Sequence, residues 1–234
     1  MLGRSLLMKA GGVVHFEPNP PFANVVLLLH GDGANGSTTI VDSSPRPKTV
    51  TPIGNAQIST AQGRFGESSI AFDTNGDYLR LDGSSEFAFS GGWTIEFWYY
   101  ANGTSRFYET LFDTRASGQS TANGISIYHG GSAPFITCDT GGTGVTITGF
   151  TLNQWHHVAF SKVGTSLRAF LDGVQSGATV THTANIIVNP NRPVIGANLA
   201  LNAGLNGFFD EFRISADWGY VSNFPVPTGP FPDA

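Results

Sequence analysis

The chain has 234 residues and a formal net charge of −5 at pH 7, with only 12% charged residues. Its twelve Lys and Arg residues are scattered and form no basic stripe, which argues against nucleic acid and anionic membranes as partners. The 30 glycines and 18 phenylalanines favour an all-β protein with short strands, tight turns and little helix. Cys138 is the single cysteine, which excludes an intrachain disulfide, and we expect it to be a buried, unreactive thiol.

Composition sets residues 1–24 apart from the remainder of the chain. Lys9 interrupts the apolar start, which therefore lacks the core of a secretory signal, and no apolar run approaches the roughly 20 residues that cross a bilayer. The run Pro18-Asn19-Pro20-Pro21 favours an extended backbone without internal hydrogen bonds. We therefore predict an extended N-terminal arm over 1–24 of a soluble protein, held either by the domain itself or by neighbouring chains.

The β-sandwich is predicted to begin at Val25–His30, whose continuous apolar run suits a strand that is covered on both faces. Asn75-Gly76 predicts a two-residue hairpin between its flanking strands, and Asp172-Gly173 predicts another, because these residues tolerate positive φ. Strand patterns occur at 25–30, 48–53, 56–60, 69–73, 77–82, 93–101, 107–113, 124–130, 133–139, 144–148, 155–162, 166–172, 192–196 and 207–214.

Two strands carry the strongest pattern, Gly92–Tyr100 and Asn153–Phe160. In both, aromatic and β-branched residues alternate with polar residues, which is typical of half-buried strands. Together with the many short strands, this pattern predicts one antiparallel β-sandwich over 25–217. Unrelated proteins build such sandwiches, so the pattern indicates architecture before function.

The end of the chain is rich in proline. Asn223–Pro232 contains four prolines in ten residues, and a segment of this kind cannot pair as a central strand. We predict an extended C-terminal tail over 218–234.

Several segments together resemble the laminin G-like members of the concanavalin A-like lectin/glucanase superfamily. They are Leu27–Gly33, Phe65–Phe72, Trp93–Tyr100, Gly207–Ile214, and the strand Trp155-His156-His157-Val158-Ala159 with the later turn Leu171-Asp172-Gly173. The likeness covers residues 25 to about 217, and the order and spacing of the motifs carry it. It implies a jelly-roll sandwich whose first and last strands are adjacent in one sheet.

A narrower likeness concerns Leu28-Leu29-His30, Asp32-Gly33, Gly36-Ser37-Thr38-Thr39, Asp42-Ser43-Ser44 and the tail Asn223–Pro232. These motifs are similar to copies found in tailed-phage virion proteins. The likeness implies a component of a virion. The chain departs from that pattern at Gly31 and at Asp217–Tyr220, which leaves any ligand preference open.

No arrangement of residues predicts an enzyme. Glucanases of this superfamily place an acid and a nucleophile about 5–5.5 Å apart on alternating strand positions, whereas Glu96 has no such neighbour and Asp210 and Glu211 are adjacent in sequence. His156 and His157 lie within one predicted strand, where adjacent side chains diverge and zinc binding is not favoured. We expect both histidines to be hydrogen-bonded structural residues and the protein to be non-enzymatic.

Calcium is the metal that the resemblance implies, near the first and last strands. Ca²⁺ binds carboxylate and backbone oxygens, and Asp32 follows the first strand in a turn loop. Asp210 has the same parity as Phe212 and Ile214, so we expect it to face inward, where a bare carboxylate is costly. We hypothesise that Asp32 and Asp210, together with backbone oxygens, bind one Ca²⁺. The alternative is that Asp210 accepts hydrogen bonds from backbone amides or pairs with an arginine such as Arg213.

Sugar binding requires exposed aromatic rings that stack on pyranose faces, flanked by polar side chains. The sequence candidates are Trp218, Tyr220, Tyr99, Tyr128 and His129. The alternative for each of them is a place in the core.

Two functions remain open at this stage. The first is a non-enzymatic structural protein of a phage virion, a capsid decoration or tail-associated subunit whose arms dock on other virion proteins or on copies of itself. The second is a carbohydrate-binding module for adhesion to host-surface glycan, which rests on analogy of fold. A decoration can also adhere, so the two are compatible.

Overall fold

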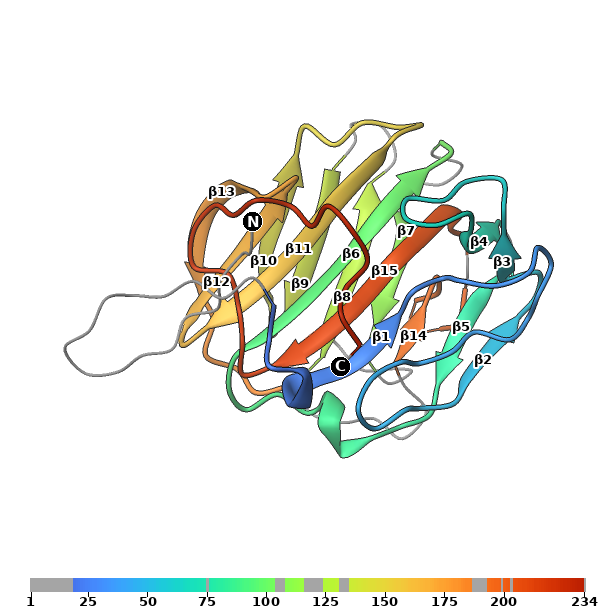
Figure 1. Ribbon diagram of the computed structural model, residues 1–234. Helices are drawn as coiled ribbons and strands as arrows, with labels where there is room; N and C mark the ends of the chain where they lie inside the picture. Colours follow the sequence, from blue (N-terminus) through green and yellow to red (C-terminus); the bar gives the residue numbers. More distant parts are fainter. Residues whose placement is uncertain are drawn as a thin grey trace.

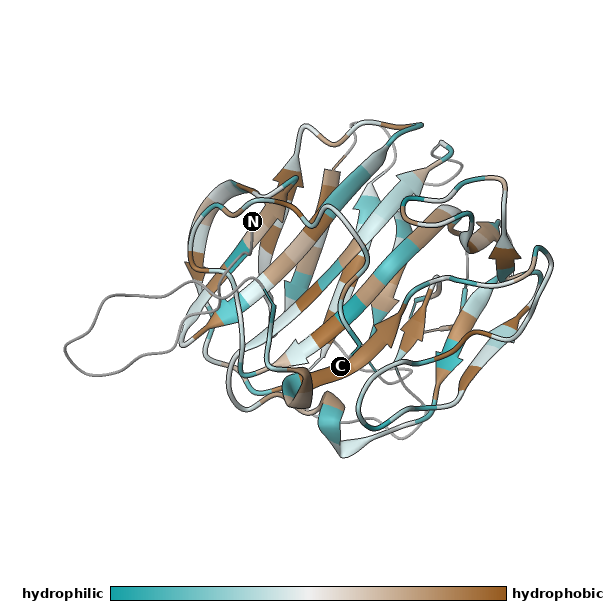
Figure 2. Ribbon diagram, viewed as in Figure 1, coloured by the Kyte–Doolittle hydropathy of each residue, from teal (hydrophilic) through white to brown (hydrophobic). Residues whose placement is uncertain are grey.

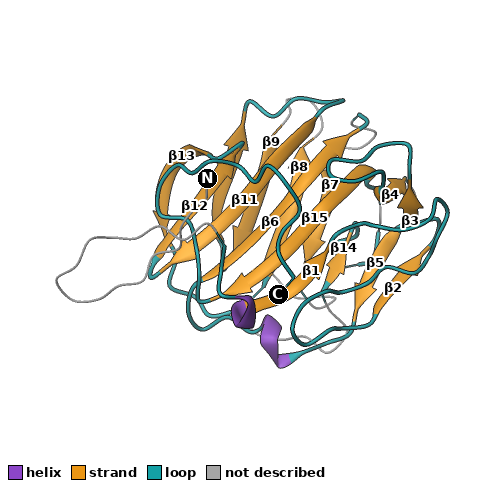
Figure 3. Cartoon of the chain, viewed as in Figure 1, coloured by secondary structure: helices purple, strands orange, loops and turns teal. Residues whose placement is uncertain are grey.

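The computed structural model describes residues 19–74, 76–103, 108–115, 124–130, 135–186, 193–198, 200–202 and 204–233. In these residues the chain forms two 3-10 turns and fifteen strands (Figures 1 and 3). The turns are η1 (Phe22–Asn24) and η2 (Ser85–Phe87). The strands are β1 (Val25–Leu29), β2 (Val50–Ile53), β3 (Gln57–Ser59), β4 (Ser69–Asp73), β5 (Tyr78–Leu81), β6 (Trp93–Ala101), β7 (Tyr108–Asp113), β8 (Ile125–Gly130), β9 (Phe135–Thr140), β10 (Thr143–Thr148), β11 (Trp155–Val163), β12 (Ser166–Leu171), β13 (Val174–Thr181), β14 (Val194–Ile195) and β15 (Asn206–Ala216).

The strands form two stacked antiparallel sheets. The larger sheet has the order β13-β12-β11-β6-β15-β4-β3, and β1 pairs with β15 beside that path. The smaller sheet has the order β10-β9-β8-β7-β14-β5-β2. The predicted all-β sandwich is confirmed, and so is the expected adjacency of the first and last strands.

The core lies between the two sheets. On β6, Trp93, Ile95, Phe97 and Tyr99 are buried in it, and the residues between them face outward from the larger sheet. Figure 2 shows that apolar and polar residues both occur along the strands. Cys138 is buried in this core, and burial raises the pKa of its thiol, as expected for an unreactive cysteine.

One predicted hairpin is confirmed and one is wrong. β12 and β13 pair through the two-residue turn Asp172-Gly173, in which both residues have positive φ. β4 and β5 do not pair with each other, because β4 belongs to the larger sheet and β5 to the smaller one. The buried Asp77 carboxylate accepts hydrogen bonds from Asn55 N at 2.7 Å and Asp73 N at 2.9 Å, which fixes a corner between the sheets. Asn75 itself lies outside the described residues.

Strand β13 was not predicted. Its sequence, VQSGATVT, shows no clear alternation of apolar and polar residues, because the strand is exposed or half-buried along its whole length. It is an edge strand of the larger sheet, and Thr148 N at the end of β10 donates to Ser176 Oγ in β13 at 3.0 Å.

A β-bulge in β15 reverses the expected orientation of Asp210. Glu211 has φ of 53°, and the register of β15 against β6 shifts between Asp210 and Arg213. Phe209 and Phe212 therefore both face the core, while Asp210 lies opposite Trp98 on the outer face. The inward orientation expected from parity was wrong for this reason.

The C-terminal tail packs on the outer face of the larger sheet. In Figure 1 the dark-red tail crosses β12, β11, β6 and β15 and ends beside β1. Trp218, Tyr220 and Phe224 form a cluster with Ala159 of β11 and Phe170 of β12. Phe231 packs against Val25 and Leu28 of β1.

The outer edge of β1 is covered by a loop. Leu28 N donates to Asp42 Oδ1 at 3.0 Å, and Ser43 N donates to Leu28 O at 2.8 Å. These bonds occupy backbone groups that an added strand would need. In the described part of the chain there is no helix that is long and apolar enough to cross a membrane.

Candidate functional site

Three aromatic side chains form a row across the larger sheet. Trp155 of β11 and Phe208 of β15 both lie directly opposite Tyr100 of β6, one on each side of it. The Tyr100 ring centroid is 5.6 Å from that of Trp155 and 6.0 Å from that of Phe208. We call Trp155, Tyr100 and Phe208 the aromatic row.

The aromatic row lies at the end of the sheet that the tail leaves uncovered. Trp155 and Tyr100 are half-buried, and Phe208 is 9% exposed. An exposed amide borders it: Asn102 follows β6, and its Nδ2 donates to Asn206 Oδ1 at 3.1 Å. Partly exposed aromatic rings flanked by amides can stack on an apolar ring face and hydrogen-bond its polar rim.

A second row lies beside the first, toward the middle of the sheet. Trp98 is opposite His157 on one side and Asp210 on the other. The loop between β3 and β4 folds over this row, with the Phe65 ring edge-on to Trp98 at 5.7 Å and the Arg64 guanidinium 4.0 Å from the Trp98 centroid. This loop buries Trp98, which is only 3% exposed.

Asp210 holds that loop in place. Its Oδ2 accepts hydrogen bonds from Arg64 N at 2.8 Å and Phe65 N at 3.0 Å, while Oδ1 is buried without a hydrogen-bond partner. Burial raises the pKa of Asp210 to about 7, although the two backbone hydrogen bonds lower it. These two hydrogen bonds are of the kind that the alternative to calcium binding expected, in which backbone amides donate to Asp210.

Glu96 lies in a third row, beneath the tail. Its Oε1 accepts from Arg213 Nε at 3.0 Å and Nη2 at 2.8 Å, and its Oε2 accepts from the Tyr220 hydroxyl at 2.9 Å. His157 Nε2 is 3.3 Å from the same Oε2. Burial alone would raise the pKa of Glu96, but the charge of Arg213 and the contact with His157 outweigh it and lower the pKa to about 2. The carboxylate is therefore ionised, paired and covered.

Four of the five sugar-binding candidates from the sequence are buried. Trp218 is 6% exposed and Tyr220 4% exposed, because both pack under the tail against the sheet. Tyr99 and His129 face the core, where their rings pack against Phe150. These four side chains are buried, which was the alternative for each of them, and a sugar cannot stack on them.

Tyr128 is the candidate that remains partly exposed. It lies on the outer face of the smaller sheet, with its ring 5.4 Å from that of Tyr108, which is 64% exposed. Neighbouring Thr137 and Thr146 hydrogen-bond each other through their hydroxyls at 2.9 Å. This second aromatic surface lies on the opposite face of the sandwich from the aromatic row.

Few oxygen atoms near Asp32 and Asp210 are available to bind Ca²⁺. Asp32 is exposed and close enough to Asp210 for its charge to raise the pKa of Asp210. The free Oδ1 of Asp210 would suit a cation. The backbone oxygen next to Asp32, Gly31 O, already accepts a hydrogen bond from the Ser68 hydroxyl at 3.1 Å. Among the residues that the structure describes, no group of three His, Cys, Asp or Glu side chains is placed to hold a metal. Two carboxylates supply only part of the six to eight oxygens that Ca²⁺ takes, so backbone oxygens and water would have to complete the set.

The predicted structural role of His156 is confirmed. His156 Nδ1 is 2.7 Å from Asp172 Oδ2, and its Nε2 is 2.8 Å from the Thr151 hydroxyl. His157 contacts Glu96 as described and packs edge-on against Trp98 at 5.3 Å.

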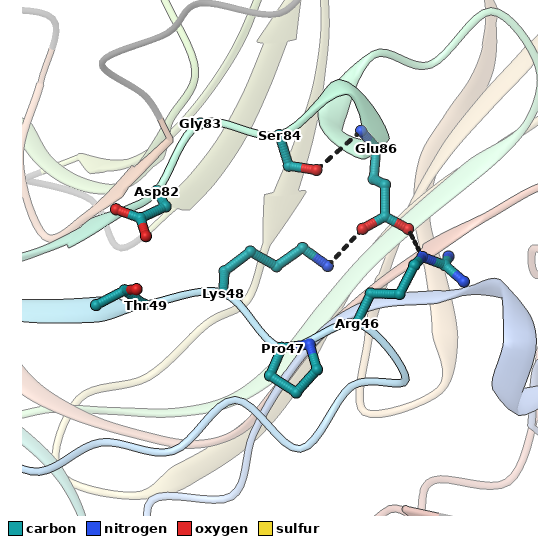
Figure 4. A pocket seen from close by; sticks show the side chains of 8 residues that line it. All are labelled: Arg46, Pro47, Lys48, Thr49, Asp82, Gly83, Ser84 and Glu86. Atoms are coloured by element: carbon teal, nitrogen blue, oxygen red, sulfur yellow. Dashed lines mark hydrogen bonds and ion pairs between the residues drawn. The ribbon is translucent and has the colours of Figure 1, made fainter.

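A separate polar pocket of about 400 Å³ lies where β2 begins and β5 ends (Figure 4). Arg46 and Lys48 both pair with Glu86, the latter at 2.8 Å. Burial would raise the pKa of Glu86, but hydrogen bonds from Lys48 and Arg46 lower it. Its lining has no aromatic ring and its cations are already paired, so this pocket lacks the features of the aromatic row.

The sequence did not identify the aromatic row. Alternation in β6 places Trp98 and Tyr100 on the face opposite to the core residues Trp93, Ile95, Phe97 and Tyr99. This part of the row could have been predicted from the sequence. The alignment of Trp155 and Phe208 with Tyr100 depends on the register between strands that are far apart in sequence.

Comparisons with known proteins agree with this architecture. Domain 4 of AbnA, an extracellular arabinanase from Geobacillus stearothermophilus, was solved in complex with arabinotriose. It has a TM-score of 0.61 and 18% identity, covering 85% of this chain and 95% of that one. The ligand-binding domain of botulinum neurotoxin serotype D, in complex with N-acetylneuraminic acid, has a TM-score of 0.63 and 11% identity, covering 85% of this chain and 49% of that one.

At these identities the structures share the fold, and the chain spans about half the length of the neurotoxin domain. No curated protein matches the sequence. A family model described as concanavalin A-like lectin/glucanases superfamily matches residues 73–217. With its two stacked antiparallel sheets, the chain belongs to the concanavalin A-like lectin/glucanases superfamily.

Proposed function

We propose that the protein is a non-catalytic glycan-binding module that binds sugar rings on the aromatic row. The observation that carries the proposal is the register that aligns the half-buried Trp155 and Tyr100, backed by the more buried Phe208, at the end of the outer face beyond the tail. An aromatic ring offers a flat apolar surface to the C–H face of a pyranose, and the amide of Asn102 supplies hydrogen bonds to its hydroxyls.

Two similar structures support this proposal. The arabinanase domain was solved with a bound arabinose oligosaccharide, and the neurotoxin domain with a bound sialic acid. Their likeness to this chain is a likeness of fold alone, so the proposal of a sugar site depends on the aromatic row of this chain.

The non-catalytic part of the proposal rests on the two carboxylates of the outer face. Glu96 is paired with Arg213 and covered by the tail, and Asp210 accepts two backbone hydrogen bonds under a loop. Neither is placed as an exposed acid or nucleophile beside the aromatic row, which glycoside hydrolysis would need.

The virion location is a further proposal that rests on the motifs shared with tailed-phage proteins. The C-terminal tail is occupied by its own domain, so docking would depend on the N-terminal arm. The end of that arm is also held by the domain, because Asn19 accepts from Arg213 at 3.0 Å and Phe22 packs beside Phe231, so the proposal assigns docking to residues 1–18. Deleting residues 1–18 should abolish incorporation into particles while the domain stays folded, and unchanged incorporation would refute the docking role.

A glycan array tests the binding function. Wild type should retain a defined set of glycans, and Trp155→Ala should lose them, because it removes the largest ring of the aromatic row. Tyr108→Ala is the matched control, since it removes an exposed aromatic ring from the other face of the sandwich. Loss with Tyr108→Ala and retention with Trp155→Ala would move the site to the smaller sheet, and an array without any bound glycan would refute the function.

A further inference from the structure

Arg64 lies beside the aromatic row with an exposed side chain. Its guanidinium carbon is 4.0 Å from the Trp98 ring centroid and 4.9 Å from that of Phe65. Trp98 and Tyr100 face the same side of β6 two residues apart, which corresponds to about 7 Å along a strand. A substituent of a sugar stacked on Tyr100 is therefore within reach of Arg64.

The position of Arg64 is fixed in two ways. Its backbone N–H is held by Asp210 Oδ2 at 2.8 Å, and its guanidinium plane is held by the Trp98 ring. Contact between the guanidinium and an aromatic ring leaves the N–H groups at the edge of the guanidinium available for a planar acceptor. The donor fork is thus pre-organised, so that less entropy is lost on binding.

The charge of Arg64 has no counterion within the described parts of the chain. Arg46, Arg115 and Arg213 each form an ion pair with a nearby carboxylate, whereas Arg64 forms none. Asp210 directly beneath it is buried with a pKa raised to about 7, so near neutral pH it carries only part of a negative charge. Asp32 and Glu67 are exposed acids of the same region, and neither forms an ion pair with Arg64.

We propose that Arg64 selects anionic sugars for the site. The aromatic row holds the sugar ring, and the guanidinium donates two parallel N–H hydrogen bonds to the carboxylate of a uronic or sialic acid. This inference rests on the proposed glycan-binding function and adds the class of ligand. It also makes Arg64 a binding residue, unlike Arg46, Arg115 and Arg213, which pair with carboxylates of the domain.

Titration calorimetry with matched ligand pairs tests the proposal. The pairs are sialyllactose against lactose, and trigalacturonic acid against its methyl ester, so that the two sources of a sugar carboxylate are compared. In at least one pair, wild type should bind the carboxylate form about tenfold or more tightly, as expected for a charge-assisted bidentate contact. Arg64→Gln should remove that preference without weakening the neutral partner, and Arg64→Lys should restore part of it.

Arg80→Gln is the control, because Arg80 is exposed on β5 of the smaller sheet and should not affect either preference. Equal affinities of wild type for both members of each pair would overturn the assignment of Arg64 while leaving glycan binding intact. A preference that survives Arg64→Gln would also overturn it. Binding of every ligand that is insensitive to Trp155→Ala would instead refute the aromatic row, and with it the proposed function.

Discussion

The hydroxyl of Tyr220 in the C-terminal tail donates a hydrogen bond to Glu96 in the middle of the larger sheet, over 2.9 Å. These residues are 124 positions apart, and Glu96 is also paired with Arg213 and in contact with His157. The tail therefore completes the polar shell of a buried carboxylate. It is part of the domain, and this contact explains why a proline-rich end is ordered.

Tyr220→Phe should destabilise the domain. The substitution keeps the ring in its cluster with Trp218 and Phe224 but removes a donor to a buried, ionised acceptor, which costs about 1–3 kcal/mol. Urea denaturation measures the change, with Tyr78→Phe, a half-buried tyrosine on β5, as the control. An unchanged free energy of unfolding would show that the Tyr220 hydroxyl contributes nothing to the shell of Glu96.

Deleting residues 218–234 should have a larger effect than any single change in the tail. It uncovers Phe170, Val25 and Leu28, and loss of several buried aromatic side chains should cost at least about 3 kcal/mol. A shorter deletion of 232–234 retains Phe231 and serves as the control. Thermal unfolding and binding of an apolar dye would report the change; equal behaviour of the two deletions would contradict the packing described here.

The sequence predicted the regular strands well and the irregular features poorly. The 93–101 strand was found with its limits because a strong alternation marks it, whereas β13 was missed because both of its faces are exposed. The bulge at Glu211 is a backbone irregularity that reverses the parity of Asp210, and no residue type announces it. Trp218 and Tyr220 were candidates for exposed stacking rings, with a place in the core as the alternative, because the sequence of the tail does not show on which sheet it lies.

Asp210→Asn should change how stability depends on pH. The folded-state pKa of Asp210 is raised from 3.8 to about 7, so the wild-type contribution is fully present below pH 3.8 and is lost as pH rises through 7. Asparagine keeps an oxygen for the N–H groups of Arg64 and Phe65 and does not ionise. Urea denaturation at pH 5 and pH 8 should show a smaller loss of stability for the variant than for wild type, and identical losses would contradict the raised pKa.

Glu96 should make stability depend on pH in the opposite direction. Its folded-state pKa is lowered from 4.5 to about 2, so its contribution is present above pH 4.5 and is lost as pH falls toward 2. Replacing Glu96 with Gln should remove stability at pH 6 and much less at pH 2.5. A constant difference between wild type and variant over this range would contradict the ionised pair with Arg213.

Calcium binding by Asp32 and Asp210 stays a prediction. Calorimetric titration of wild type with Ca²⁺ should give a saturable heat that Asp32→Asn weakens, because the exposed carboxylate supplies one of only two charged ligands. Wild type without affinity stronger than millimolar would rule out the site. A heat that is unchanged in Asp32→Asn would place any calcium elsewhere.

Sugar binding by the aromatic row can be observed in a crystal structure of the protein with a glycan retained on the array. We expect a sugar ring against Trp155 and Tyr100, with its substituents toward Asn102 and Arg64. A glycan bound instead at Tyr108 and Tyr128, or in the polar pocket beside Glu86, would contradict it.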